Sequence, residues 1–311
     1  MALLERKKAL GAKIESAYAT DPTISTSTDG IQTIGLDIQH ITGDFVTRGL
    51  DRSALGAEGD VLVSNRGQIS FGVEAAGSGA AGTAPAWGKL MRACGFAETT
   101  NAGVSNVYTP VSSSFSSLWM EGNRDGNKHT IKGCRGNVSL NWQARQIPQF
   151  DYVFTGLYVA AVAAALPTYT LTAWKAPVAF NKANTPTATL HSESIKVESI
   201  SIDVQNDIQH RDIPGSEEVL IVDRNVRGSI TFEAPLQSTK DWWAISIART
   251  QAALQIVHGG TAGNIIQLDA PKVELSNPRY SESQGVLMLT MDMILVPSAA
   301  AGNDEFTITA K

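Results

Sequence analysis

Polar and apolar residues alternate along many short segments of the chain, and one of these alternating segments occurs twice. The copies share an arginine, a glycine, an isoleucine and a phenylalanine at equal spacing: Arg66, Gly67, Ile69 and Phe71, then Arg227, Gly228, Ile230 and Phe232, 161 positions later. A period of two predicts a strand with one buried face. A repeated strand of this kind predicts two homologous domains in one chain.

A tryptophan-rich segment follows each copy and predicts a short helix, over residues 84–96 and 240–250. Thr83 and Pro85 are typical of the N-cap and first turn of the first helix. Residues 126–160 match the second half in another register, 137 positions apart, and a weaker match pairs residues 36–39 with 202–205. The difference of 24 between the two main registers predicts extra residues in the first copy. Their Ala, Gly, Ser and Thr composition over 97–117 is typical of a surface loop.

These patterns predict a mainly β protein with one helix per domain. We expect an N-terminal arm at 1–30, a first domain at 31–160, a linker at 161–190 and a second domain at 191–311. The arm is expected to open with a short helix near residues 3–14. From composition alone, two interpretations of this arm are equally favoured: it contacts a neighbouring molecule, or it is a frayed terminus. Two aromatic side chains, Trp174 and Phe180, predict that the linker packs on a surface.

Composition and charge narrow the classes of function. The 311 residues are 43% hydrophobic and 18% charged, with 25 basic and 30 acidic side chains and a net charge of −5. The absence of a basic stripe argues against a tight grip on nucleic-acid phosphates. Cys94 and Cys134 stand outside any Cys-x-x-Cys pattern and are expected to be buried free thiols in a reducing cytoplasm. We expect no secretion signal and no membrane-spanning segment.

Residues 77–82 form a literal Gly-x-Gly-x-x-Gly between a predicted strand and helix, the pattern of a dinucleotide site. The same junction in the second copy, residues 234–239, contains no glycine, so the repeated fold does not use this loop to hold a pyrophosphate. The five histidines lack metal-ligand spacing, and there is no Gly-x-Ser-x-Gly elbow. We therefore predict no catalytic, cofactor-binding or metal-ligating residue, and no enzyme.

Several segments resemble the major tail tube proteins of tailed bacteriophages that have long, non-contractile tails (siphovirus type). The resemblance rests on residues 8–16, 75–96, 154–158 and 270–275. It implies two tandem tail-tube domains, each a β-sandwich with a flanking α-helix. It further implies rings of six domains, in which three copies of the chain together form a pseudo-hexamer. These rings are implied to stack into a hollow tube through which phage DNA passes during infection.

The resemblance also implies partners and locations. These are further copies of the chain, the tail tip, tape-measure and tail terminator proteins, and double-stranded DNA in transit without specific binding. The protein is expected in the virion tail after assembly in the bacterial host cytoplasm, with no cofactor and no membrane partner. A lumen that lets DNA slide should be polar and acidic or neutral, because fixed cations would hold phosphates.

Ring-to-ring contacts are expected from the arm, from the polar loop at 43–60 and from its shorter counterpart loop at 207–218. The candidate residues of the loop at 43–60 are Asp44, Arg48, Asp51, Arg52 and Glu58. Deleting residues 2–25 is expected to leave a folded protein that cannot elongate. The alternative function is a β-sandwich adhesin or carbohydrate-binding virion protein, which would present exposed aromatic side chains. The six tryptophans lie mostly at positions typical of a core.

Overall fold

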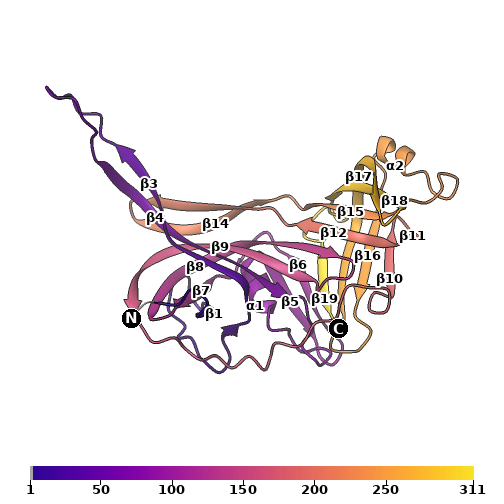
Figure 1. Ribbon diagram of the computed structural model, residues 1–311, viewed down its shortest axis with the longest axis horizontal. Helices are drawn as coiled ribbons and strands as arrows, with labels where there is room; N and C mark the ends of the chain where they lie inside the picture. The colour runs from indigo at the N-terminus through magenta and orange to yellow at the C-terminus, as the bar shows by residue number, and fades with distance from the viewer. Residues whose placement is uncertain (1–2) are drawn as a thin grey trace.

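The computed structural model describes residues 3–311, which form an elongated β structure with a long hairpin at one end and a short helix near the other (Figure 1). The first domain contains β1 (Lys8–Ile14), β2 (Gly30–Ile31), β3 (Ile34–Thr47), β4 (Asp60–Glu74), α1 (Gly88–Ala93), β5 (Phe96–Asn101), β6 (Ser105–Pro110), β7 (Leu118–Arg124), β8 (Asn127–Gln143) and β9 (Gln149–Ala163). The second contains β10 (Thr187–Leu190), β11 (Glu193–Ser194), β12 (Val197–Asp203), β13 (Asn206–Ile213), β14 (Ser216–Arg224), β15 (Arg227–Glu233), α2 (Trp242–Ala248), β16 (Gln251–His258), β17 (Ile266–Ser283), β18 (Val286–Leu295) and β19 (Thr307–Ala310).

The pairing of the central strands confirms that the two domains are homologous. In the first domain Ile69 of β4 faces Phe154 of β9, and in the second Ile230 of β15 faces Met291 of β18. These partners are displaced by 161 and 137 positions, as the sequence registers predict. All four side chains are buried. The fold is mainly β, built from two tandem homologous domains with one helix each, as predicted.

The 137-position register is wrong for one strand. Ser139 of β8 faces Asp151, whereas Ser281 of β17 faces Met288, so β8 and β17 lie 142 positions apart while their partners lie 137 apart. The first domain has a longer loop at 144–148, where β17 and β18 are joined by a two-residue turn. Likewise Ile38 faces Ile69 as Ile200 faces Ile230, so residues 36–39 do not correspond to 202–205.

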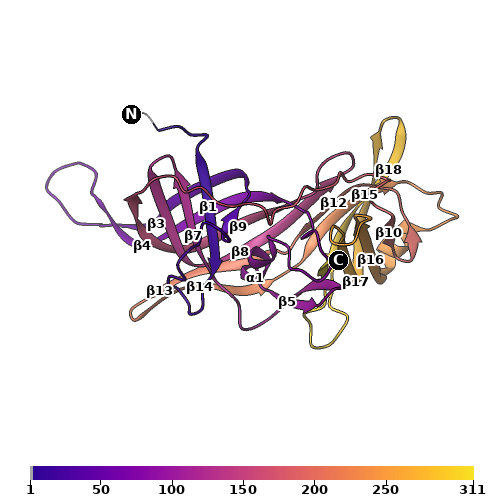
Figure 2. The ribbon, with the colours of Figure 1, turned by 90° about the horizontal axis from the view of Figure 1, so that it is seen from below.

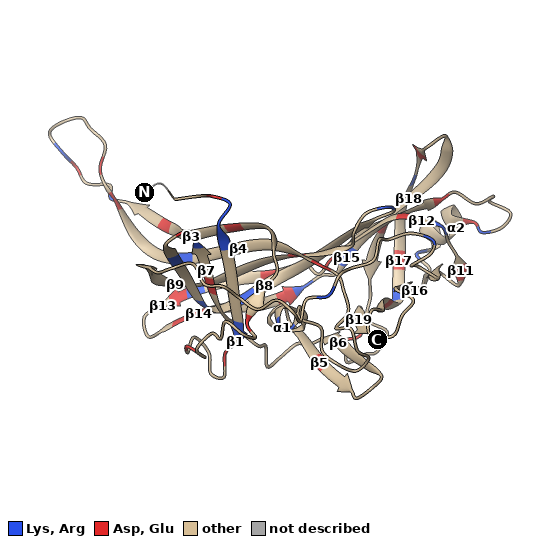
Figure 3. Cartoon of the chain, turned by 60° about the horizontal axis from the view of Figure 1, so that its bottom comes forward, with Lys and Arg blue, Asp and Glu red and all other residues tan. Residues whose placement is uncertain are grey.

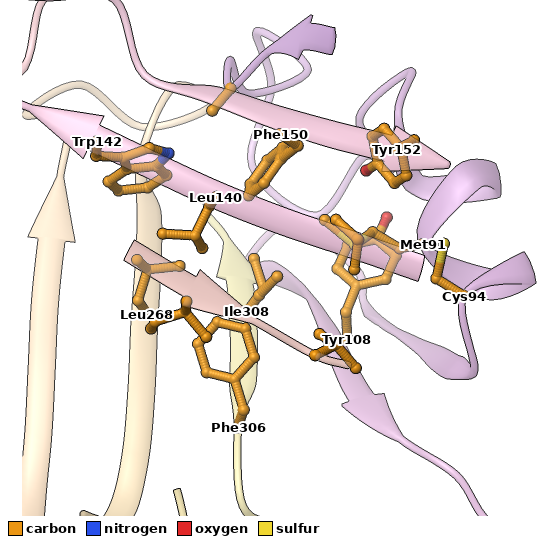
Figure 4. Close-up of a cluster of buried hydrophobic side chains, with 14 of the residues drawn as sticks. Met91, Cys94, Tyr108, Leu140, Trp142, Phe150, Tyr152, Leu268, Phe306 and Ile308 are labelled. Carbon is orange, nitrogen blue, oxygen red and sulfur yellow. The ribbon is translucent and has the colours of Figure 1, made fainter. Parts of the chain in front are cut away.

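The two domains share one hydrophobic core. Figure 4 shows Leu268, Phe306 and Ile308 of the second domain grouped with Leu140 and Tyr108 of the first. The C-terminal strand β19 pairs with β6 of the first domain, with Ile308 facing Tyr108. Burying each of these large side chains contributes roughly 1.5–3 kcal/mol. The domains therefore form one packed body.

The linker packs on the first domain, as its aromatic residues predicted. The Trp174 indole Nε1 donates a hydrogen bond to the Gly30 carbonyl at 3.0 Å. Phe180 is buried beside Trp142, with ring centroids 5.9 Å apart. Between β9 and β10 the chain thus lies along the protein surface.

The N-terminal helix expected near residues 3–14 is wrong, because Lys8–Ile14 is the strand β1. It pairs with β7 along its whole length and buries Leu10 and Ala12 in the core. The apolar residues that fit one face of a helix fit the inward face of a strand equally well. Removing residues 2–25 would take a strand out of the sheet. This packing contradicts the expectation that such a deletion leaves the fold intact.

Two segments expected to be loops are paired strands. Residues 96–110, within the supposed polar insertion, form the β5–β6 hairpin, and residues 206–213 form β13. Their outward-facing residues are polar, so composition concealed the alternation. The helix caps also differ from expectation: α1 has no side-chain cap, whereas Asp241 caps α2 by accepting from the Ala244 N–H at 2.9 Å. Within residues 3–311 no helix is long and apolar enough to cross a membrane.

Candidate assembly interface

The two domains are joined by a hairpin of the second domain that lies on the sheet of the first. The β13–β14 hairpin packs on β8 and β9 and buries Val219 and Ile221. At its base the Asn206 side-chain Nδ2 donates to the carbonyls of Cys94, at 2.8 Å, and Gly136, at 2.9 Å. One buried amide thereby satisfies two acceptors of the other domain, as buried carbonyls require.

Arg135 holds the middle of the same hairpin. Its guanidinium NH1 donates to the Val219 carbonyl at 2.7 Å and lies over the Tyr18 ring, 5.2 Å from its centroid. The Tyr18 hydroxyl accepts from the Val219 N–H at 2.6 Å. Burial raises the pKa of Tyr18 to about 12, so it remains a neutral phenol at physiological pH. The N-terminal segment, through Tyr18, is part of the domain joint.

Next to the hairpin, β12 of the second domain pairs with the edge of β8. Five residue pairs run from Ser199 opposite Gln143 to Asp203 opposite Ser139. The Asn137 Nδ2 adds a side-chain hydrogen bond to Asp203 at 2.7 Å. The sheet therefore continues from one domain into the next without an unpaired edge.

The glycine-rich loop at 77–82 also belongs to the joint. The Gly77 N–H donates to the Asn264 side chain at 2.9 Å, and the Gly79 N–H to the Gly263 carbonyl at 2.8 Å. A Cβ at Gly77 would lie 2.1 Å from the Gly263 carbonyl oxygen. The close approach of the two domains explains the glycine at position 77.

Both halves of this joint recur in the chain without a partner. By strand pairing, β3 occupies in the first domain the position of β12 in the second, and β17 occupies the position of β8. Among the described residues β3 pairs with β4 alone. The pairing of β17 with β16 ends at Glu274, after which β17 pairs only with β18. Each domain therefore presents the half of the joint that the other domain uses inside the chain.

These two open edges lie at opposite ends of the molecule. The β3–β4 hairpin projects from one end of the long axis, and α2 with the β17–β18 hairpin lies near the other (Figures 1 and 2). Complementary surfaces at opposite ends produce head-to-tail assembly, which forms a closed ring or an open filament.

The structure divides the five candidate residues of the predicted loop. Asp44 lies in β3, where it pairs with Arg66 at 2.8 Å, and this hydrogen bond lowers the pKa of Asp44. Arg52 and Glu58 pair with each other at 3.0 Å within the loop at 48–59. The remaining two, Arg48 and Asp51, are exposed in that loop. The prediction of one loop from 43 to 60 is wrong, because β3 and β4 extend into it as paired strands.

The repeated signature has a structural role in both copies. Its isoleucines and phenylalanines are buried: Ile69, Phe71, Ile230 and Phe232. Its glycines allow close strand approach, because a Cβ at Gly228 would lie 2.1 Å from the Ser201 carbonyl oxygen. The two arginines differ, since Arg66 pairs with Asp44 while Arg227 donates to the Asn225 side chain.

Exposed apolar side chains were missed by the sequence reasoning. They lie on the β3–β4 hairpin and around α2: Ile41, Phe45, Val46, Val61, Leu62, Val63, Leu236, Ile247, Tyr280, Val286 and Leu287. The apolar run at 61–63, inside the supposed polar loop, was the signal that could have revealed the first group. Charged side chains of both signs are interspersed over the two domains (Figure 3). In the described part of the chain no three His, Cys, Asp or Glu side chains cluster to hold a metal ion.

A two-domain β protein with complementary open edges at its two ends has the features of a subunit that could assemble edge to edge. The family model described as phage tail tube protein matches residues 5–297, and the chain belongs to this family. It is therefore a structural tail protein of the virion that self-assembles into a tube. No curated protein matches the chain at a significant level.

Proposed function

We propose that this protein forms the tube of a long, non-contractile phage tail from stacked rings of three copies, and that phage DNA passes through the tube during infection. The observation that carries the proposal is the β8–β12 joint, which occurs once inside the chain and whose two halves recur unpaired at β17 and β3. A partner copy at each end closes both edges, which otherwise invite aggregation.

The stoichiometry follows from the duplication. The resemblance to tail tube proteins implies six domains per ring, and each copy supplies two domains and one internal joint. Three copies then supply six domains, three joints inside chains and three between chains. The division into domains at 31–160 and 191–311, with a linker at 161–190, is part of this proposal. The segment 1–30 is assigned to the part of the ring formed by the first domain, because its strand β1 pairs with β7.

Ring-to-ring contacts are assigned to the loop at 48–59, which extends beyond the paired part of its hairpin (Figure 2). Its charged residues are Arg48, Asp51, Arg52 and Glu58. In the virion the tube meets tail tip, tape-measure and tail terminator proteins, after assembly in the host cytoplasm. The lumen is polar and acidic or neutral, and double-stranded DNA slides through it without specific binding. The adhesin alternative receives no support from the tryptophans, since Trp87, Trp142 and Trp242 are buried and the other three are partly buried.

Negative-stain electron microscopy of the purified protein, incubated across a concentration series, tests the proposal. We expect stacked rings or hollow tubes whose end views show three-fold or pseudo-six-fold symmetry. A protein that stays monomeric at every concentration, even with tail tips added as nuclei, would refute the proposal. Rings with any other symmetry would refute the three-copy stoichiometry alone.

A further inference from the structure

We propose that the exposed apolar surface at the α2 end of the second domain is the docking site for the β3–β4 hairpin of a second copy, with β3 pairing onto the free edge of β17. This inference rests on the proposed function and specifies which surfaces of two copies meet. Its basis is the internal joint, which shows how a hairpin of one domain seats on the sheet of the other.

The second domain exposes positions that the first domain buries. Val138 of β8 faces Tyr152, and its counterpart Tyr280 of β17 faces Leu289. Val138 is 3% exposed, whereas Tyr280 is 57% exposed. On the neighbouring strand Phe150 is 0% exposed because Trp87 and Trp142 of its own domain pack against it, whereas its counterpart Leu287 is 53% exposed. Beside Val138 the chain passes from β12 into β13. The Val204 N–H holds it there by donating a hydrogen bond to the Val138 carbonyl at 3.1 Å. Tyr280 lacks such a cover.

The surface around Tyr280 is continuous with α2. The Trp243 ring lies 5.2 Å from the Tyr280 ring between centroids, and α2 packs on β17. Ile247 of α2 is exposed on this end of the domain. In the first domain the corresponding end of α1 is covered by the internal hairpin, since Asn206 bonds the Cys94 carbonyl. Exposed aromatic and aliphatic side chains grouped in this way mark an interaction site.

The β3–β4 hairpin has the composition of the occupant. Phe45 faces Leu62 and Val46 faces Val61 across the two strands, so apolar pairs lie on both faces of the ribbon. All four side chains are exposed. A two-stranded ribbon is marginally stable alone and gains stability when a face is buried. The hairpin is therefore built to lie against another surface.

The internal joint also gives the register. Asp203 of β12 faces Ser139 of β8, and both β12 and β3 are held on their other side by the repeated signature strand. Asp203 and Thr42 both face the signature arginine, Arg227 in one domain and Arg66 in the other. Transferring the pairing places Thr42 of one copy opposite Ser281 of the next. Because the transferred pairing is antiparallel, residues after Thr42 run past Tyr280 toward Arg279, and residues before Thr42 lie on the side of Glu282 and its partner Leu287.

A cysteine pair tests this register in the full chain. Thr42→Cys combined with Ser281→Cys is expected to form an intermolecular disulfide under mild oxidation, because opposed Cβ atoms lie near bonding distance. Non-reducing gels should show a ladder that ends at three linked copies. Gln209→Cys combined with Ser281→Cys is the matched control, since Gln209 is exposed on the internal hairpin. The native Cys94 and Cys134 are buried and do not compete.

A second measurement uses single substitutions on each surface. Phe45→Glu and Tyr280→Glu should each raise the concentration needed for assembly by roughly 30-fold or more, while the monomer keeps its melting temperature. Val104→Glu, an exposed valine in the β5–β6 turn, is the control and should assemble normally. Tubes that form without the Thr42–Ser281 cross-link, or unimpaired by both glutamates, would overturn the docking site while the proposed function stands. A parent chain that never assembles would overturn both.

Discussion

Replacing Asn206 with alanine tests whether the internal joint stabilises the whole chain. The side-chain Nδ2 donates to two carbonyls of the first domain, those of Cys94 and Gly136, and the residue is buried. Alanine leaves both carbonyl oxygens without this donor. An orphaned buried acceptor costs about 1–3 kcal/mol. The loss for Asn206→Ala should therefore be about 2–4 kcal/mol, since relaxation around the smaller side chain relieves part of the penalty.

The assay is urea unfolding of the monomer at a concentration below assembly, followed by tryptophan fluorescence. A loss of about 2–4 kcal/mol lowers the unfolding midpoint by roughly 1 M if the slope is about 3 kcal/mol/M. Asn206→Asp should lose more than Asn206→Ala, because a carboxylate replaces the donor and faces two carbonyl oxygens. Gln209→Ala is the matched control on the same strand, and its exposed side chain predicts a change within about 0.5 kcal/mol.

Equal midpoints for Asn206→Ala and Gln209→Ala would refute the reasoning. That result would mean that the two carbonyls are satisfied by water in the folded protein, and that the domains are held by the shared core alone. An intermediate in the Asn206→Ala transition would carry a different meaning. It would show that the two domains unfold separately once the joint is weakened.

Two further predictions concern pH and backbone approach. Burial lowers the pKa of His191 and His258, and burial with the nearby His40 lowers that of His129, all from an ordinary 6.5. Because these pKa values are lower in the folded protein, the unfolded chain binds more protons at mildly acidic pH. The free energy of unfolding should therefore be constant above about pH 6.5 and fall as the pH drops below it. A melting temperature at pH 5.5 that equals or exceeds the value at pH 7.5 would contradict this. Gly228→Ala should cost about 2 kcal/mol or more, since its Cβ would meet a backbone carbonyl at 2.1 Å, whereas Gly260 has open space and its alanine variant should melt like the parent.

The sequence was sufficient where burial imposed a clear period. The signature strands, with Ile69 and Ile230 inward, and a short helix within residues 240–250 were predictable, because side-chain alternation is a local property. The alternating segments and the two tryptophan-rich segments predicted the mainly β class with one helix per domain. Each of these features is determined by residues that lie close together in the sequence.

The errors arose where the partner of a segment is distant in sequence. Residues 8–14 read equally well as a helix or a strand, and only β7, more than a hundred residues later, decides between them. The polar outward faces of β5, β6 and β13 resemble loop composition. Asp44 is a strand residue that lies opposite Ser64 and reaches Arg66 with its side chain, which composition does not show. The exposed apolar stem at Phe45 was hidden by the charged residues of the adjoining loop.

The pairing of β19 with β6 sets the order in which the molecule can be completed during translation. Tyr108 of β6 faces Ile308 of β19, which is synthesised two hundred residues later, so β6 gains this partner strand late. β6 therefore stays incomplete on the ribosome until synthesis has passed residue 310. A chain truncated before residue 307 should therefore lack this part of the contact between the two domains.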